Sequence, residues 1–109
     1  MPLRKAANRS NAETMRAHAA DATRLLKALA NEKRLMILCL LVDSERTVGE
    51  LNDLLDLSQS ALSQHLAVLR GDGLVQTRRD AQNVVYSLQK GPAQRIIDIL
   101  HKVYCGGHD

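Results

Sequence analysis

The spacing of apolar residues changes abruptly at residues 71–73, Gly-Asp-Gly, and this change restricts the possible fold more than any other feature. Before it, leucines recur at helical spacing between residues 58 and 70, as they do on the buried side of an amphipathic helix. After it, apolar and polar side chains alternate over residues 74–78 and 84–88, as in strands with one buried face. The pattern predicts a helix that the glycines end, followed directly by a β-hairpin.

Two helices are predicted upstream. Apolar residues follow a helical stripe over residues 11–29. Asn31 can cap a second helix over residues 32–42. That second segment is apolar nearly all round, which indicates a buried central helix.

A helix-turn-helix is predicted next. Thr47 and Glu50 have the spacing of a capping box, which would begin a short helix over residues 48–55. Ser58 can cap the following helix, which runs to about residue 70. Two helices joined by so short a turn form a helix-turn-helix.

A final helix is predicted after Gly91-Pro92, with apolar residues along one side. The predicted order is therefore α-α-α-α-β-β-α, in which the hairpin directly follows the helix-turn-helix. This is a mainly α fold with a β-hairpin wing, a winged helix-turn-helix. We expect one DNA-binding and dimerisation domain over residues 11–109.

The charge of the chain is concentrated at its start. Arg4, Lys5 and Arg9 lie within residues 1–10, which hold no acidic residue and are predicted to form a disordered basic arm. Subtracting these three from the 15 basic residues leaves 12, equal to the number of acidic residues. The longest apolar run, residues 35–42, is far shorter than the roughly 18 residues of a membrane helix. With no recognisable signal peptide, a cytoplasmic protein is predicted.

The helix over residues 58–70 carries hydrogen-bonding side chains on the side opposite its leucines. A DNA major groove accepts an α-helix, and Ser, Gln and small apolar groups can read base edges there. A solvated surface helix would show the same spacing. Arginines at the tip of the predicted hairpin favour the DNA-binding interpretation, because they could contact a phosphate backbone. His65 lies at the edge between the two sides, where packing is its main expected role. The predicted DNA-binding residues are Ser58, Gln59, Ser60, Ser63, Gln64, His65, Arg78, Arg79 and Gln82.

The stretch "LSQSALSQHLAVLRGDGLVQTRRDAQNVVYSL" resembles the recognition helix and wing of the ArsR/SmtB family of small dimeric bacterial repressors. The upstream "LLKALANEKRLMILCLL" extends the resemblance over nearly all of the chain. It implies a homodimer, joined through the first and last helices, that binds an inverted repeat in double-stranded DNA. Many relatives have a glycine at the position of Ala81, so any positive-φ residue in the wing turn is expected to be Asp80 or Asn83.

The chain has two cysteines, Cys39 in "MILCLL" and Cys105 in "KVYCGG". On the apolar side of a buried helix, Cys39 alone would be interpreted as an inert small side chain. Cys105 lies near a helix end beside Lys102 and is expected to be more exposed and more reactive. Their places resemble those in the persulfide-responsive branch of the family, the BigR, SqrR and HlyU type. This resemblance implies a dithiol that reactive sulfur or oxidants bridge, with loss of DNA affinity and no bound cofactor.

Other functions remain as alternatives. Many metal-responsive relatives carry Cys-x-Cys in the helix before the recognition helix, but residues 50–57 contain no cysteine, and Asp98, His101 and His108 lack the paired spacing of another branch. We therefore predict no metal site. A constitutive anti-silencing regulator with structural cysteines, or a protein-interaction module, would also fit the fold. A thiol oxidoreductase is disfavoured because the cysteines are 66 positions apart (105 minus 39) with no Cys-x-x-Cys, so we do not expect an enzyme.

Overall fold

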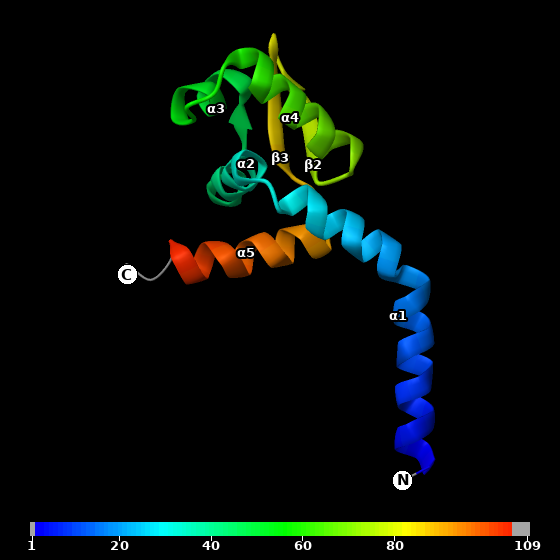
Figure 1. Cartoon of the computed structure of the whole chain (residues 1–109). Coiled ribbons are helices and arrows are strands. Elements are labelled where there is room, and N and C mark those ends of the chain that lie inside the picture. Colours follow the sequence, from blue (N-terminus) through cyan, green and yellow to red (C-terminus); the bar gives the residue numbers. More distant parts are fainter. Residues whose placement is uncertain (1, 106–109) are drawn as a thin grey trace.

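The computed structural model describes residues 2–105, with side chains from residue 11 onward. Within this range the chain forms five helices and three strands (Figure 1). The helices are α1 (Pro2–Leu29), α2 (Glu32–Asp43), α3 (Val48–Leu54), α4 (Gln59–Gly71) and α5 (Pro92–Tyr104), and the strands are β1 (Arg46–Thr47), β2 (Val75–Asp80) and β3 (Asn83–Leu88). The predicted winged helix-turn-helix is confirmed, with α3 and α4 as its helix pair and β2 and β3 as its wing.

The predicted helix caps are present in the structure. Asn31 Oδ1 accepts a hydrogen bond from the amide three residues on, at 3.1 Å. At α3, Thr47 Oγ1 accepts from the Glu50 amide at 3.1 Å, and Glu50 Oε1 accepts from the Thr47 amide at 2.9 Å. Ser58 Oγ accepts from the amide at the start of α4 at 3.1 Å. These bonds satisfy donors that a helix start otherwise leaves unpaired, so the ends of the helix-turn-helix are determined locally.

The core lies where α2, α3, α4 and α5 meet the sheet. Its fully buried side chains are aliphatic: Ile37, Leu38, Leu51, Leu62, Leu66, Leu69 and Ile97. Two of these belong to α2, which packs against α1, α4, α5 and β3. The prediction of a buried central helix is thus confirmed. Since α4 turns three leucines inward, its opposite side faces solvent.

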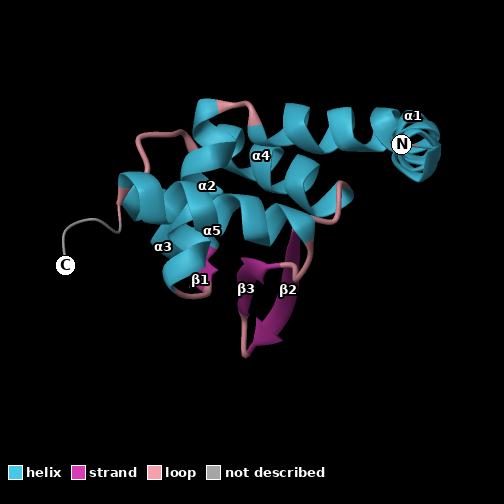
Figure 2. Cartoon of the chain, turned by 90° about the horizontal axis from the view of Figure 1, so that it is seen from below, coloured by secondary structure: helices cyan, strands magenta, loops and turns pink. Residues whose placement is uncertain are grey.

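The strands form one antiparallel sheet in the order β1-β3-β2. Strands β2 and β3 form the predicted hairpin, which projects away from the helices (Figure 2). Strand β1 was not predicted. It consists of Arg46 and Thr47, which pair with Tyr86 and Val85 of β3. Two residues are too few to show an alternating pattern, so only the fold reveals this strand.

The wing turn differs from the prediction. Asp80 and Asn83 form the last pair of the ladder, so only Ala81 and Gln82 connect the strands. Ala81 has a φ of 58°, and it is the only non-glycine residue with a positive φ among those that the structure describes. The expectation that Asp80 or Asn83 would supply this conformation is wrong, because pairing holds both in extended backbone. The left-handed conformation costs a non-glycine residue roughly 1 kcal/mol.

Helix α1 begins at Pro2 rather than at Asn11, so the helix continues through residues 2–10, where we predicted a disordered basic arm. Proline suits the first helical position, and no further proline or glycine occurs before Gly49. The sequence therefore contains no residue that would end the helix early. The side chains of Arg4, Lys5 and Arg9 lie outside the described part of the structure, as do residues 106–109.

Candidate nucleic-acid interface and cysteine pair

Helix α4 separates its side chains onto two sides. Leu62, Leu66 and Leu69 are at most 2% exposed and anchor the helix to the core. The solvent side carries short polar groups and a methyl group, at Ser60, Ser63, Gln64 and Ala67. Val68, 44% exposed, is the one larger apolar side chain beside this row, and the short groups could lie against the floor of a major groove.

The predicted DNA-binding side chains divide between α4 with its cap and the wing. Eight of the nine are exposed: Ser58, Gln59, Ser60, Ser63, Gln64, Arg78, Arg79 and Gln82. His65 is half-buried, which agrees with its expected place at the edge of the leucine side. The set is accessible to a ligand as large as a double helix, although its two arginines lie in different surroundings.

A groove runs between α4 and the wing. It has a volume of about 410 Å³ and is lined by Val48, Ser63, Leu66, Ala67, Arg70, Gly71 and Tyr86. Tyr86 pairs with Thr77 across the hairpin, so both side chains lie on the face of the wing that meets α4. Arg70 and Tyr86 were not among the predicted site residues. An arginine in the last turn of α4 was a possible signal, but the position of Tyr86 depends on the folded sheet.

Alternation along β2 places Arg79 on the same face as Thr77 and Arg78 on the other. Arg78 forms a two-point contact with Glu45, with 2.6 Å from Nη2 to Oε1 and 3.3 Å from Nε to Oε2. The hydrogen bond from Arg78, followed by its positive charge, lowers the pKa of the Glu45 carboxyl, and the same contact raises the pKa of Arg78. Arg79 is thus the wing arginine that extends on the α4 side.

The two cysteines lie on α2 and at the end of α5, which pack against each other. Cys39 is half-buried in α2, and Cys105 is the exposed cap residue of α5. Both thiols are free. Burial raises the pKa of the Cys39 thiol, and the nearby negative charges of Cys105 and Asp43 raise it further. The greater exposure predicted for Cys105 is confirmed.

A side-chain contact joins the same two helices one turn away from the cysteines. His101 Nε2 lies 3.4 Å from Asp43 Oδ1, and the His101 carbonyl accepts from the Cys105 amide at 2.7 Å. Asp43 is one turn after Cys39 on α2, and His101 is one turn before Cys105 on α5. The histidine–aspartate pair therefore joins α2 to α5 one turn away from the two free cysteines.

Neither a metal centre nor a membrane span is found in the described chain. Between residues 11 and 105, His, Cys, Asp and Glu side chains nowhere gather in threes as ligands for a metal ion. His108, which we considered as a ligand, lies outside the described residues. No helix within residues 2–105 combines the length and apolar character needed to cross a bilayer.

An exposed polar helix beside a two-stranded wing defines the class of protein. A helix-turn-helix places its second helix in the major groove, and the wing here carries Arg79 beside that helix. Fold and surface together are those of a winged helix-turn-helix, DNA-binding transcriptional regulator.

The chain belongs to the arsR family of bacterial regulatory proteins, whose model matches residues 31–77. It is 54% identical over 105 residues to the transcriptional activator HlyU of Vibrio cholerae, covering 96% of each chain. A solved structure of reduced HlyU from Vibrio cholerae matches with a TM-score of 0.80 and 56% identity, covering 85% of this chain and 98% of that one. The transcriptional repressor BigR from Xylella fastidiosa matches with a TM-score of 0.80 and 37% identity, covering 89% of this chain and 96% of that one.

Proposed function

We propose that this regulator is a dimeric, sequence-specific transcriptional repressor that senses reactive sulfur or oxidants through Cys39 and Cys105. In this proposal it binds an inverted-repeat operator in the cytoplasm when both thiols are reduced, and it loses affinity when they are bridged. The observation that carries the sensing step is the placement of two free thiols on two helices packed against each other.

The dimer is supported by apolar side chains that a single chain leaves uncovered. On α1 and α5 these are Met15, Leu26, Ile99, Val103 and Tyr104, each at least 56% exposed. An apolar surface of this kind usually marks an interface. A symmetric pair joined through α1 and α5 would present two copies of α4 to two half-sites, which lie about 34–36 Å apart on DNA.

The proposed chemistry needs only a sulfane-sulfur donor, such as a low-molecular-weight persulfide RSSH. The Cys105 thiolate attacks the outer sulfur of RSSH, the S–S bond breaks, and RSH leaves with a proton. The product is a Cys105 persulfide. Cys105 acts first because it is the exposed thiol, whereas burial hinders access to Cys39 and raises its pKa, which lowers its thiolate fraction.

Cys39 then closes the bridge. Attack by its thiolate on the inner sulfur of the Cys105 persulfide forms a disulfide and releases H₂S. If Cys39 is first converted to a persulfide as well, attack of one persulfide on the other forms a trisulfide and again releases H₂S. In each case the donor is reduced and the two thiols are oxidised. A longer bridge suits cysteines whose Cα atoms lie beyond the roughly 7 Å limit of a direct disulfide.

A bridge would act on DNA binding from a distance. It would fix the end of α5 to α2, and α5 carries part of the surface that we assign to the dimer. A small change in the dimer then alters the distance between the two α4 helices. Typical coupling of about 1–3 kcal/mol corresponds to about a 5- to 150-fold change in affinity.

The direct test is fluorescence anisotropy on the DNA upstream of the protein's own gene, at fixed salt. We expect the reduced protein to bind tightly and polysulfide treatment to weaken binding by about tenfold or more, within the usual range of coupling. A thiol reductant should restore the affinity. Tight binding that polysulfide leaves unchanged would contradict the sensing step, keep the DNA-binding function, and make metal titration the next measurement.

The DNA face can be tested by separating base contacts from phosphate contacts. Gln64→Ala should cost about 1–3 kcal/mol on the specific duplex and little on an unrelated one, because an amide reads base edges. Arg79→Gln should weaken both complexes alike and reduce the slope of log affinity against log salt by about 0.9 for each subunit, which is about 1.8 for the proposed dimer. The matched control is Lys90→Gln, which removes the same charge from the exposed segment between β3 and α5. Equal losses in all three variants would disprove the assigned face.

A second candidate function is favoured by one comparison. Because HlyU of Vibrio cholerae is a transcriptional activator, this chain could act as a constitutive anti-silencing regulator in which the cysteines are structural. A reporter placed under its upstream DNA separates the two. Deleting a repressor raises expression, whereas deleting an anti-silencer lowers it.

A further inference from the structure

We propose that Glu45 is a positioning residue of the wing, which holds Arg78 away from α4 until a DNA phosphate displaces it. Glu45 would then weaken DNA binding without touching DNA. This inference rests on the DNA-binding function proposed above and concerns how that same surface is controlled.

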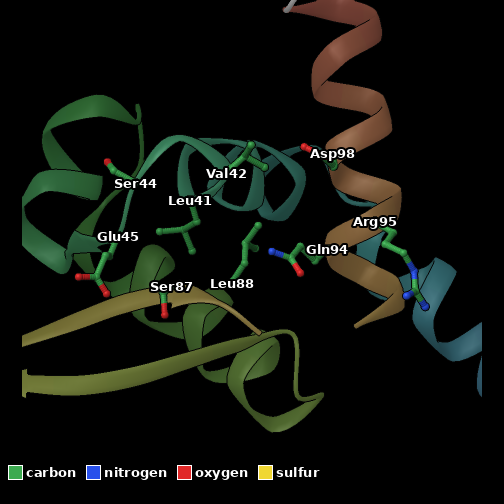
Figure 3. A pocket seen from close by; sticks show the side chains of 9 residues that line it. All are labelled: Leu41, Val42, Ser44, Glu45, Ser87, Leu88, Gln94, Arg95 and Asp98. Atoms are coloured by element: carbon green, nitrogen blue, oxygen red, sulfur yellow. The ribbon is translucent and has the colours of Figure 1, made fainter. Parts of the chain in front are cut away.

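The pairing of the strands places Arg78 on the back of the wing. Arg78 lies opposite Val85, and cross-strand partners share a face. Side chains alternate along β3, so Val85 and Ser87 face away from the Tyr86 side, which forms the groove with α4. The back face borders a cavity of about 450 Å³ between α2, β3 and α5, whose lining includes Glu45 and Ser87 (Figure 3).

Glu45 occupies one of the donor edges through which Arg78 could bind a phosphate. Its two carboxylate oxygens contact Nε and Nη2 of Arg78, the fork geometry that guanidinium also uses toward phosphate. With this edge occupied, a two-point contact of Nε and Nη2 with a DNA phosphate requires Glu45 to leave, and only the Nη1 side of the guanidinium is open. The residues are 33 positions apart in sequence, so the fold rather than local chain geometry brings them together.

The contact also cancels charge where the wing would meet DNA. Arg78 and Arg79 contribute two positive charges, and Glu45 and Asp80 contribute two negative ones. Strands β2 and β3 together with Glu45 therefore carry no net charge, and the contact holds the Glu45 charge against Arg78. Displacing Glu45 exposes one more cation to the phosphate backbone.

The pair is placed where it can open. Its side chains are 54% and 46% exposed, and exposed pairs of this kind are weak because water screens them. β2 is an edge strand, with β3 on one side and no strand on the other within the described chain. A released Arg78 side chain can therefore swing round the free edge of β2 toward the α4 side.

The test is a double-mutant cycle measured by anisotropy across a salt series, with wild type, Glu45→Gln, Arg78→Gln and the double variant. Each is measured on the upstream duplex and on an unrelated duplex of equal length. Glu45→Gln should tighten binding about three- to tenfold on both and steepen the salt slope by about 0.9 for each subunit, which is about 1.8 for the proposed dimer with one more phosphate contact per subunit. Both effects should disappear in the Arg78→Gln background. Glu32→Gln, which removes the same charge from the exposed first turn of α2, is the matched control.

Each outcome decides a different point. Unchanged or weaker binding by Glu45→Gln would disprove the role of Glu45. Equal tightening with and without Arg78 would do the same, since it would show only long-range charge. If the wild-type protein shows no salt-dependent binding to either duplex, the DNA-binding function fails and this inference fails with it. Circular dichroism of each variant verifies that the fold is kept.

Discussion

Replacing either cysteine by serine is expected to abolish the response to reactive sulfur and to leave DNA binding by the reduced protein intact. The wild-type loss of about 5- to 150-fold in affinity should shrink to less than about twofold in Cys39→Ser and in Cys105→Ser. The reason is that one thiol can take up sulfur but cannot bridge α2 to α5. Anisotropy before and after polysulfide treatment measures the effect.

The two variants serve as controls for each other. Cys39→Ser should still gain sulfur at Cys105, which mass spectrometry detects as an added mass, yet keep its affinity for DNA. Persulfide formation without loss of binding would show that the bridge, rather than modification of one thiol, is the signal. A Cys39→Ser protein that responds as fully as wild type would disprove the dithiol switch.

Leu62→Ala is expected to destabilise the fold by about 2–5 kcal/mol, the usual cost of removing a buried leucine side chain. Leu62 is fully buried on α4 and connects this helix to the core. Against a total stability of about 5–15 kcal/mol, such a loss would remove a large share of the free energy of unfolding. Urea unfolding at fixed protein concentration gives the difference, since the proposed pairing of chains would contribute to apparent stability.

Val68→Ala provides the comparison on the same helix. Val68 is 44% exposed, so its truncation leaves no cavity and should cost less than about 1 kcal/mol. Equal losses in the two variants would mean that α4 is held by something other than its leucine side.

Local signals in the sequence predict most of the fold. Asn31, Ser58 and the Thr47–Glu50 box each bond within their own helix start, so four consecutive residues are enough to recognise them. The glycines at the end of α4 and the alternation of apolar and polar residues beyond them likewise predict the conformation of the backbone close to them in sequence. For that reason the helix-turn-helix and the hairpin agree with the structure to within one or two residues.

Features that depend on distant segments were missed. Strand β1 exists only because β3 lies beside it, and the groove position of Tyr86 requires α4 and the sheet together. Glu45 gave no signal in the sequence, since its partner is 33 positions away. Ala81 takes its left-handed conformation because the ladder extends to the residues on either side of the turn, which alternation alone did not indicate.

The uncovered apolar side chains of α1 and α5 have a consequence for how much protein a cell must hold. If one chain binds a half-site weakly and a pair binds both, operator occupancy depends on the number of pairs. At low abundance that number rises with the square of the amount of chain, so doubling synthesis gives about four times as many pairs. Expression of the controlled genes would then change steeply with the dosage of this regulator, even when the supply of the proposed inducer is constant.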